Sequence, residues 1–254
     1  MLARYTVNLL QQIRIWAQRA DFPNIFVLTG GAGTGKSTVA RTIAEEFEAG
    51  KSLGRYIFFK REKTDSTSIT STVINTIVYH LACHSSAIAE SLLNVFNNHH
   101  EPSFLSTRIL FDRLLHDPLY STSISRISRP VLVVLDALDE CASILGQEEL
   151  SDLLKDDIST LPSNFRFLVT SRPEEGIFPL LSDASLHSHI YQHVKLDHMS
   201  ENSKEEVVFY IRHKFERLRR EKRMIVKGNL EWDENIDKLG CAAEGLFIWA
   251  ATAI

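Results

Sequence analysis

The feature that most constrains the fold is a short apolar run that leads directly into a glycine-rich segment and then into a helical pattern. Residues 25–28 read Ile-Phe-Val-Leu, and residues 30–38 read Gly-Gly-Ala-Gly-Thr-Gly-Lys-Ser-Thr. A short continuous apolar run before a turn is typical of a strand that is buried on both faces. From Val39 onward the apolar residues recur at helical spacing, so the segment predicts a strand, a turn and a helix in that order.

The glycine-rich segment matches G-x-x-x-x-G-K-S, the pattern of a phosphate-binding P-loop. Its glycines let the backbone adopt positive φ angles, so that successive N–H groups can surround a phosphate at the N-terminus of the helix. We expect Lys36 to reach the β- and γ-phosphates of a nucleotide, Ser37 to bind Mg²⁺ and Thr38 to meet the α-phosphate. The predicted nucleotide-binding residues are Gly30, Gly31, Ala32, Gly33, Thr34, Gly35, Lys36, Ser37 and Thr38.

The composition argues against several other classes of protein. With 254 residues, of which 44% are hydrophobic, the chain can bury a sizeable core. Its formal net charge of −4 lacks the basic excess of a dedicated nucleic-acid binder. The three cysteines are far apart and form no C-x-x-C pair, which argues against a disulfide framework or a zinc site. The sequence has neither the apolar core of a signal peptide nor a run of membrane-spanning length, so we expect a cytoplasmic protein that binds no membrane.

The order of the predicted elements divides the chain into three regions. Residues 1–23 form a helix ahead of the first strand, and in residues 24–199 strands alternate with helices. This alternation predicts the α/β class, with a mainly parallel five-stranded sheet between helices. Residues 200–254 read as a small helical subdomain, which we expect to be truncated because the chain stops inside an apolar helix. The strands are expected at residues 25–28, 55–60, 131–135, 165–170 and 189–196.

A carboxylate ends the most strand-like run of the protein. Residues 131–135 are all Val or Leu, and Asp136 follows them. In a P-loop protein a carboxylate at this place holds the Mg²⁺ shell opposite Ser37. Asp139 and Glu140 come within about one helical turn of Asp136, and one of them could activate the water that attacks the γ-phosphate, with Glu140 as first choice and Asp139 as second. The alternative interpretation, that these acids cap the next helix, stays open.

Another predicted strand ends in two hydroxyl side chains and an arginine. Residues 165–170 are mostly apolar and lead into Ser171 and Arg172. The ends of neighbouring parallel strands converge on the ligand crevice, so Thr170 or Arg172 could contact the γ-phosphate. Arg172 is equally compatible with a surface position before Pro173.

Two observations bear on the choice of ligand. The sequence contains no Asn-Lys-x-Asp motif for reading guanine, which favours ATP over GTP. Residues 212–227 are strongly basic, but Glu216 and Glu221 lie among them. This mixture favours a solvated helix face over a nucleic-acid patch.

Four segments together carry a family resemblance: residues 28–38, 134–141 (Val-Leu-Asp-Ala-Leu-Asp-Glu-Cys), 168–173 (Leu-Val-Thr-Ser-Arg-Pro) and 245–250 (Gly-Leu-Phe-Ile-Trp-Ala). They resemble the NACHT-type nucleotide-binding domains of fungal NOD-like receptor proteins, including nephrocystin-like N-terminal P-loop regions. These domains belong to the STAND class of signal-transduction ATPases.

The resemblance implies a slow ATPase that acts as a molecular switch, closed with ADP and oligomeric with ATP. It implies ATP or ADP and Mg²⁺ as cofactors, and self-association through the NTPase domain. It also implies an effector and sensing repeats in the full-length protein, outside this chain, with roles in non-self recognition and programmed cell death.

The sequence departs from the family pattern in two places. Ala137 stands where the family often has glycine, a small change that keeps the turn tight. The segment that normally supplies a nucleotide-sensing histidine is missing. Two other functions stay open: a stand-alone small-molecule kinase, with the Ser/Arg-rich residues 121–129 as its lid, and a nucleotide-binding interaction module without turnover. The acids Asp136, Asp139 and Glu140 disfavour the second of these.

Overall fold

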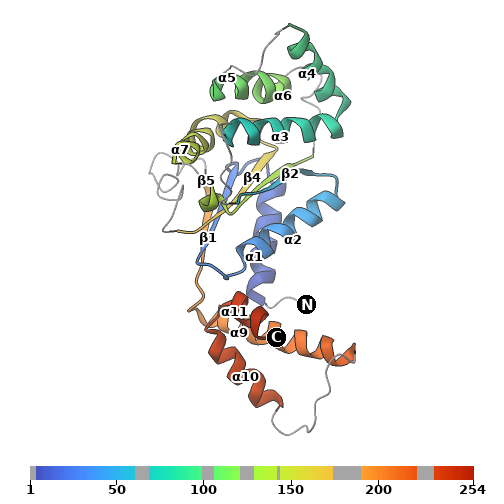
Figure 1. Cartoon of the computed structure of the whole chain (residues 1–254). Coiled ribbons are helices and arrows are strands. Elements are labelled where there is room, and N and C mark those ends of the chain that lie inside the picture. The colour runs from blue at the N-terminus through green and yellow to red at the C-terminus, as the bar shows by residue number, and fades with distance from the viewer. Residues whose placement is uncertain are drawn as a thin grey trace.

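In the part of the chain that the structure describes, five parallel strands form a central sheet in the order β2-β3-β4-β1-β5 (Figure 1). The computed structural model describes residues 4–60, 69–98, 106–120, 129–141, 144–173, 190–221 and 232–254. The strands are β1 (Ile25–Gly30), β2 (Leu53–Phe58), β3 (Val131–Asp136), β4 (Phe165–Ser171) and β5 (Ile190–Leu196). The four pairings that join these strands are all parallel, which confirms the predicted α/β class and its five-stranded sheet.

The central strands send alternate side chains to opposite faces of the sheet, as the geometry of a strand requires. Val27, Val133 and Phe167 pack into the core on one face. Phe26 and Leu28 pack into the core on the other face. Every residue of β1, β3 and β4 is buried, which explains why these strands are nearly continuous apolar runs.

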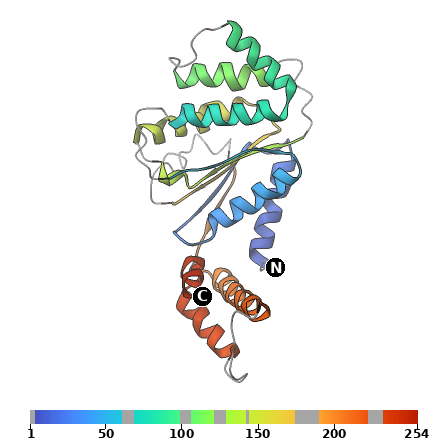
Figure 2. The same cartoon turned by 45° about the vertical axis from the view of Figure 1, so that its right-hand side comes forward.

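Helices cover both faces of the sheet, as the edge-on view shows (Figure 2). One face is covered by α1 (Arg4–Gln18) and α2 (Lys36–Ala49). The other face is covered by α3 (Ile69–His84), α4 (Ser86–Asn98), α5 (Thr107–Phe111), η2 (Asp112–His116), α6 (Asp117–Tyr120), α7 (Ile144–Asp152), η4 (Leu153–Asp157) and η5 (Ile158–Thr160). Among the described helices, none has both the length and the apolar character needed to cross a membrane.

Some elements differ from their predicted bounds by a few residues. Strand β2 begins and ends two residues earlier than the predicted strand at 55–60, and Phe59 is buried just after it. The helical segment from Thr107 to Tyr120 includes a π-helical turn, η2, and its Leu114, Leu115 and Leu119 are buried. The loop predicted at residues 121–129 lies outside the described residues apart from Arg129.

Three helices follow β5 and lie at one end of the molecule (Figure 1). They are α9 (Glu201–Arg220), α10 (Trp232–Ala243) and α11 (Phe247–Ala253). Val207, Ile211 and Ile236 form the centre of a small apolar core of their own. Helices α9 and α10 approach closely at Gly240, where a Cβ would lie 2.3 Å from Cγ2 of Val208. These helices are the small helical subdomain that the sequence predicts.

Helix α1 connects the sheet to these C-terminal helices. The backbone N–H and the hydroxyl of Thr6 each donate a hydrogen bond of 2.5 Å to the carboxylate of Glu206 in α9. This carboxylate is buried and lies at the N-terminal turn of α1, where the helix dipole stabilises negative charge. Helix α1 therefore packs on the sheet along its length and binds α9 at its N-terminal end.

Candidate nucleotide site

The P-loop connects the buried strand β1 to the first turn of α2. Gly33 and Gly35 have φ angles of 77° and 94°, a left-handed region that favours glycine. A Cβ at Gly30 would lie 2.7 Å from Oγ1 of Thr34 and 2.8 Å from the carbonyl oxygen of Leu196. The hydroxyl of Thr34 donates to the carbonyl of Gly31 over 3.0 Å and closes the turn. The loop thus leaves the first N–H groups of α2 at its centre, the arrangement that binds a phosphate.

Lys36 is the first residue of α2, and its side chain folds back over the loop. Its ammonium group donates to the carbonyl oxygens of Gly30 and Gly31, over 2.6 and 2.9 Å. The ammonium therefore lies at the phosphate-binding loop, as its predicted role requires. A phosphate bound in the loop would offer it an anionic acceptor in place of a carbonyl.

Asp136 ends β3 and accepts hydrogen bonds from three hydroxyl groups on three different elements. Ser37 of α2 donates to Oδ1 over 3.1 Å, and Thr170 of β4 donates to the same oxygen over 2.5 Å. Tyr56 of β2 donates to Oδ2 over 2.6 Å. Asp136 is fully buried. The structure therefore brings together Ser37 and Asp136, the two predicted metal ligands, although they are 99 residues apart in the sequence.

The donor set at this place suits Mg²⁺. Ser37 and Asp136 supply a hydroxyl and a carboxylate oxygen, the hard ligands that this ion prefers. Among the described residues, no group of three or more His, Cys, Asp or Glu side chains lies close enough together to hold a metal ion. Two protein ligands are typical of Mg²⁺, which keeps several waters and takes further oxygens from a bound phosphate.

Arg172 lies against both acidic residues that the sequence singles out. Its backbone N–H donates to Oδ1 of Asp139 over 3.0 Å, and its Nε lies 3.2 Å from Oδ2 of the same carboxylate. Its Nη2 lies 3.9 Å from Oε1 of Glu140. Asp139 is buried, whereas Glu140 is partly exposed. The structure therefore brings Arg172 together with Asp139 and Glu140, although its side chain stays partly exposed.

Thr170, the other residue considered as a phosphate sensor, is fully buried and engaged on both sides. Its hydroxyl donates to Asp136 and accepts the N–H of Ala137 over 2.9 Å. Ala137 itself has a φ of 59° and a ψ of 48°, a left-handed conformation. This conformation explains why glycine suits the position, since alanine there costs about 1 kcal/mol. Asp139 and Glu140 then lie in the short helical turn η3 (Leu138–Glu140).

A family model described as "Nephrocystin 3, N-terminal" matches residues 8–172 of the chain. The chain belongs to this family. The matched residues include the P-loop, Asp136 and Arg172. The assignment confirms the nephrocystin-like P-loop region that the sequence predicts. None of the curated proteins matches the chain.

Solved structures similar to this nephrocystin 3 N-terminal family member show the same fold. The ADP form of the Aeropyrum pernix ORC2 protein has a TM-score of 0.53 and 14% identity, over 98% of this chain and 60% of that one. A signal transduction ATPase with numerous domains and a tetratricopeptide repeat sensor, from Pyrococcus horikoshii, has a TM-score of 0.50 and 16% identity, over 98% of this chain and 28% of that one. The Aeropyrum pernix ORC1 protein in complex with DNA has a TM-score of 0.50 and 18% identity, over 85% of this chain and 50% of that one. The chain thus spans 60% or less of each of these proteins.

One contact of the family member's P-loop could not be inferred from the sequence. The backbone N–H of Phe247, the first residue of α11, donates to the carbonyl of Gly33 over 2.9 Å. A Cβ at Gly33 would lie 2.3 Å from Cγ2 of Ile248. The resemblance of residues 245–250 to the family is the only signal in the sequence for this contact, and it says nothing of where the segment lies.

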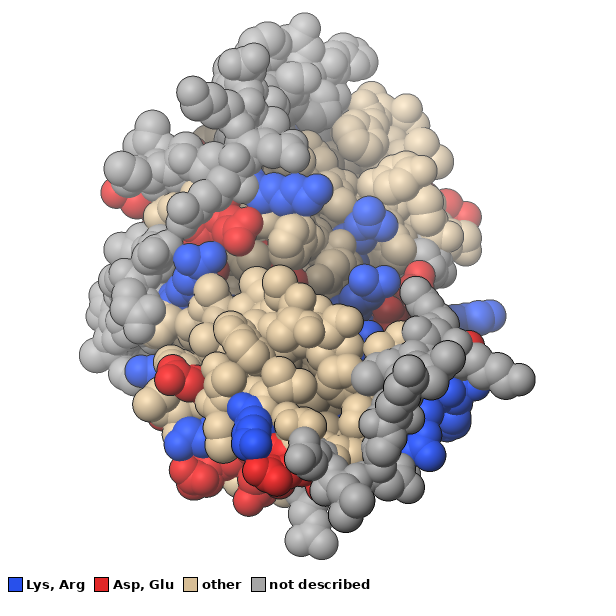
Figure 3. All heavy atoms as spheres, turned by 60° about the horizontal axis from the view of Figure 1, so that its bottom comes forward, with Lys and Arg blue, Asp and Glu red and all other residues tan. Residues whose placement is uncertain are grey.

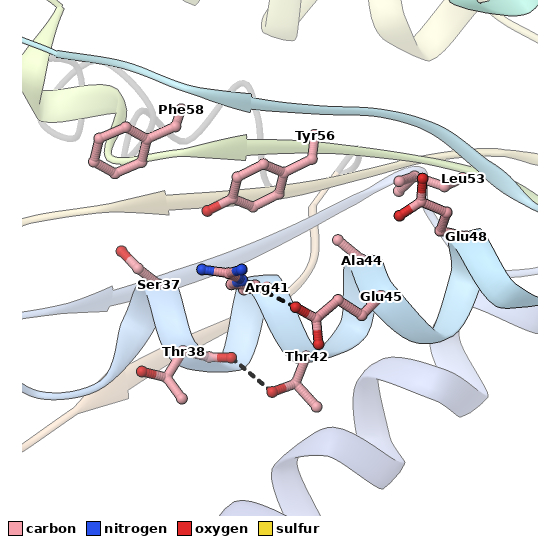
Figure 4. Close-up of a pocket in the computed structure, with 10 residues that line it drawn as sticks. All are labelled: Ser37, Thr38, Arg41, Thr42, Ala44, Glu45, Glu48, Leu53, Tyr56 and Phe58. Carbon is pink, nitrogen blue, oxygen red and sulfur yellow. Dashed lines mark hydrogen bonds and ion pairs between the residues drawn. The ribbon is translucent and has the colours of Figure 1, made fainter.

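Tyr56 is the second feature that sequence analysis missed, because nothing in an apolar strand marks one tyrosine as polar and functional. Its ring lines a cavity of about 910 Å³ between α2 and β2 (Figure 4). Ser37 and Thr38 lie at one end of this cavity and Glu48 and Leu53 at the other. Burial, the hydrogen bond to Asp136 and the charge of Asp136 raise the pKa of Tyr56 well above its usual value.

Proposed function

We propose that this chain binds ATP and ADP with Mg²⁺ and acts as a slowly hydrolysing molecular switch. The P-loop residues 30–38 would surround the phosphates with backbone N–H groups, and Ser37 and Asp136 would hold the metal. Held by these two residues, Mg²⁺ would neutralise part of the negative charge of the phosphates. The contact between Ser37 and Asp136 across α2 and β3 supports this assignment.

The observation that carries the proposal is the position of Arg172 between the two candidate catalytic acids. Asp139 binds both the backbone and the side chain of Arg172, and Glu140 lies within 3.9 Å of its guanidinium. A γ-phosphate is an anionic, multidentate acceptor that competes for the same guanidinium. Arg172 would therefore bind the acids without a γ-phosphate and turn toward the phosphate when one is present. A ligand shifts such an equilibrium only by its different affinity for the two arrangements, and ATP and ADP differ in this one group.

Slow turnover follows from the same contacts. A carboxylate whose two oxygens are both held by an arginine has less capacity to accept a hydrogen bond from an attacking water. Asp139 has both oxygens engaged by Arg172, so Glu140, with its longer contact, is the better candidate for activating water. We propose Glu140 as the catalytic acid–base residue, Asp139 as the second candidate, and Arg172 as the γ-phosphate sensor.

The cavity next to the site argues against a small-molecule kinase. A kinase needs an acceptor pocket beside its catalytic base and the γ-phosphate. The cavity beside Ser37 is lined by residues of α2 and β2, and Asp139, Glu140 and Arg172 are not among its lining residues. The kinase remains the second candidate function, and the experiment below separates it from the switch.

The finer identity of the switch rests on the sequence motifs. We propose a NACHT/STAND module of a fungal NOD-like receptor type protein, cytoplasmic, with residues 1–23, 24–199 and 200–254 as its three regions. It would self-associate through the NTPase domain and work in non-self recognition and programmed cell death. The fold similarity to a STAND protein from Pyrococcus horikoshii is in keeping with this proposal.

We propose no nucleic-acid partner, although one protein of similar fold was crystallised with DNA. In the described part of residues 212–227, Arg212 pairs with Asp233, and Arg217 pairs with Glu221 over 2.7 Å. Figure 3 looks onto this end of the molecule and shows acidic and basic side chains mixed around a largely uncharged area. A surface with both signs of charge lacks the continuous basic patch that binds phosphates.

The switch is tested by measuring ATP hydrolysis and protease protection on the purified chain. We expect slow phosphate release that nucleosides and sugars do not accelerate, and different cleavage patterns with ADP and with a non-hydrolysable ATP analogue. Arg172→Ala should bind both nucleotides but give the same pattern with each. The control is Arg217→Ala, which removes an exposed arginine and its ion pair with Glu221 on the surface of α9. This variant should behave like the parent. Rapid phosphoryl transfer to a small-molecule acceptor would establish the kinase instead.

A further inference from the structure

Tyr56 reaches the predicted metal site from the edge strand β2. In the parallel pairing of β2 with β3, Tyr56 lies opposite Val134 and Phe58 lies opposite Asp136. Alternate residues of a strand share one face, so Tyr56, Phe58 and Asp136 all lie on the face that is covered by α2. Figure 4 shows the rings of Tyr56 and Phe58 above α2. Tyr56 lies two residues before the position opposite Asp136. Its long side chain covers this distance and brings its hydroxyl to Oδ2 of Asp136.

The three hydroxyl donors divide the two oxygens of Asp136 between them. Ser37 and Thr170 both donate to Oδ1, whereas Tyr56 donates to Oδ2. A carboxylate can rotate about its last bond unless both of its oxygens are held. Tyr56 is the described donor to Oδ2. Its hydrogen bond therefore sets the rotation of the Asp136 carboxylate, whose Oδ1 faces Ser37. Each carboxylate oxygen accepts about two hydrogen bonds, so Oδ2 keeps acceptor capacity for a metal-bound water.

The hydroxyl of Tyr56 is the donor in this contact, 2.6 Å from Oδ2 of Asp136. Its hydrogen bond to a carboxylate is of the charge-assisted kind, which is stronger than a bond between neutral groups.

We propose that Tyr56 is a positioning residue for Mg²⁺: its hydroxyl holds Asp136 in the orientation that binds the metal shell. This inference rests on the proposed function, since it assumes that Ser37 and Asp136 bind Mg²⁺ with a nucleotide. It assigns Tyr56 no contact with the phosphates. Loss of the Tyr56 hydroxyl should therefore raise the Mg²⁺ concentration that ATP binding needs. The affinity for ATP without Mg²⁺ should stay unchanged.

The test compares Tyr56→Phe with the parent by calorimetric titration of ATP at a series of Mg²⁺ concentrations and in EDTA. A hydrogen bond to a charged group corresponds to about tenfold in an equilibrium constant, so the variant should need about tenfold more Mg²⁺ for half-maximal enhancement of ATP binding. Its ATP affinity in EDTA and its unfolding temperature without nucleotide should match those of the parent. Phe58→Leu changes a ring that lines the same cavity and that has no described contact with Asp136, so it should leave the Mg²⁺ requirement unchanged.

Three other outcomes would overturn the inference, and they are distinguishable. A Tyr56→Phe protein with the parental Mg²⁺ requirement would show that the hydroxyl does not position Asp136, while the proposed function would stand. Weaker ATP binding by Tyr56→Phe in EDTA as well would show that the hydroxyl acts on the fold of the site as a whole. A parent protein that binds no ATP at any Mg²⁺ concentration would overturn both the inference and the proposed function.

Discussion

The backbone N–H of Phe247 donates a hydrogen bond of 2.9 Å to the carbonyl oxygen of Gly33, so α11 begins on the P-loop itself. The two residues are far apart in the sequence, and the contact joins the C-terminal helices to the loop that would hold the phosphates. Ile248 packs against the same glycine. The P-loop and α11 are therefore in direct contact, with no intermediate element between them.

This contact predicts different effects for two neighbouring glycines. Gly33→Ala places a Cβ 2.3 Å from Cγ2 of Ile248 at a φ of 77°, so it should lower the free energy of unfolding by about 1–3 kcal/mol. Gly31→Ala is the matched control, because a Cβ there would be 4.0 Å from its nearest neighbour. We expect its stability without nucleotide to stay within about 0.5 kcal/mol of the parent. Urea unfolding of both variants checks the prediction, and equal stabilities would contradict the described contact.

The roles of Asp136 and Glu140 should separate in binding and turnover. Asp136→Asn places an amide among three hydroxyl donors and removes the charge, so it should weaken Mg²⁺-dependent ATP binding by tenfold or more, on the order of 1.4 kcal/mol. Glu140→Gln should bind ATP like the parent and lose hydrolysis. Calorimetry and phosphate release measure the two effects on the same protein samples. If Glu140→Gln hydrolyses ATP at the parental rate, the catalytic role moves to Asp139 or elsewhere.

The parts of the fold that were predicted correctly are those that local sequence patterns encode. The P-loop and the apolar runs of β1, β3 and β4 carry their structure in consecutive residues, and Asp136 is recognisable because it ends such a run. Strand β5, predicted at residues 189–196, is found at Ile190–Leu196 and lies at the edge of the sheet.

The features that were missed depend on contacts between distant segments. Thr6 and Glu206 are 200 residues apart, and Tyr56 and Asp136 are 80 residues apart. Neither pair has a spacing rule that would reveal it, since the distance between them is set by how the helices and strands pack. The end of β2 was also misplaced because Phe59 is apolar and buried without belonging to the strand.

Arg166 is another such residue, because it is a fully buried arginine inside the apolar strand β4. Its guanidinium donates to the carbonyls of Phe22 and Pro23, over 2.6 and 2.8 Å, and to that of Arg19. These carbonyls belong to the turn between α1 and β1. The guanidinium of Arg166 thus binds these three carbonyl oxygens and ties the end of α1 to the sheet.

Replacing Arg166 should therefore destabilise the fold strongly. Arg166→Met keeps much of the side-chain volume but removes the donor to the carbonyls of Arg19 and Phe22, whereas the carbonyl of Pro23 keeps the indole N–H of Trp16. We expect a loss of about 2–4 kcal/mol in the free energy of unfolding. Arg55→Met, at an exposed position of β2, should change stability by no more than about 0.5 kcal/mol. Thermal and urea unfolding compare the two variants. A loss below about 1 kcal/mol for Arg166→Met would show that the turn finds other donors, such as water.

Asp157 lies buried in η4 and has an unusual proton affinity. Its pKa is raised to about 6, mainly by burial; the charge of Arg108 lowers it, and the charges of Asp112, Asp156 and Asp152 add to the rise. Arg108 contacts the carboxylate directly from α5. The net direction is upward because desolvation of the buried carboxylate outweighs its single cationic partner.

The raised pKa of Asp157 predicts how stability changes with pH. Between the unfolded value of 3.8 and the folded value of about 6, the native state binds more protons than the unfolded state, so the free energy of unfolding falls as pH rises through this range. Above about pH 6 this loss is complete, and below pH 3.8 it is absent. Asp157→Asn removes the titrating group and should flatten the profile between these values, which makes the variant gain stability relative to the parent as pH rises. Asp156→Asn removes only one of the smaller causes of the raised pKa and leaves Asp157 buried, so it should keep most of the parental slope. Urea unfolding at intervals from pH 4 to 7.5 measures the profiles, and parallel curves for the parent and Asp157→Asn would mean that Arg108 holds the carboxylate charged in the native protein.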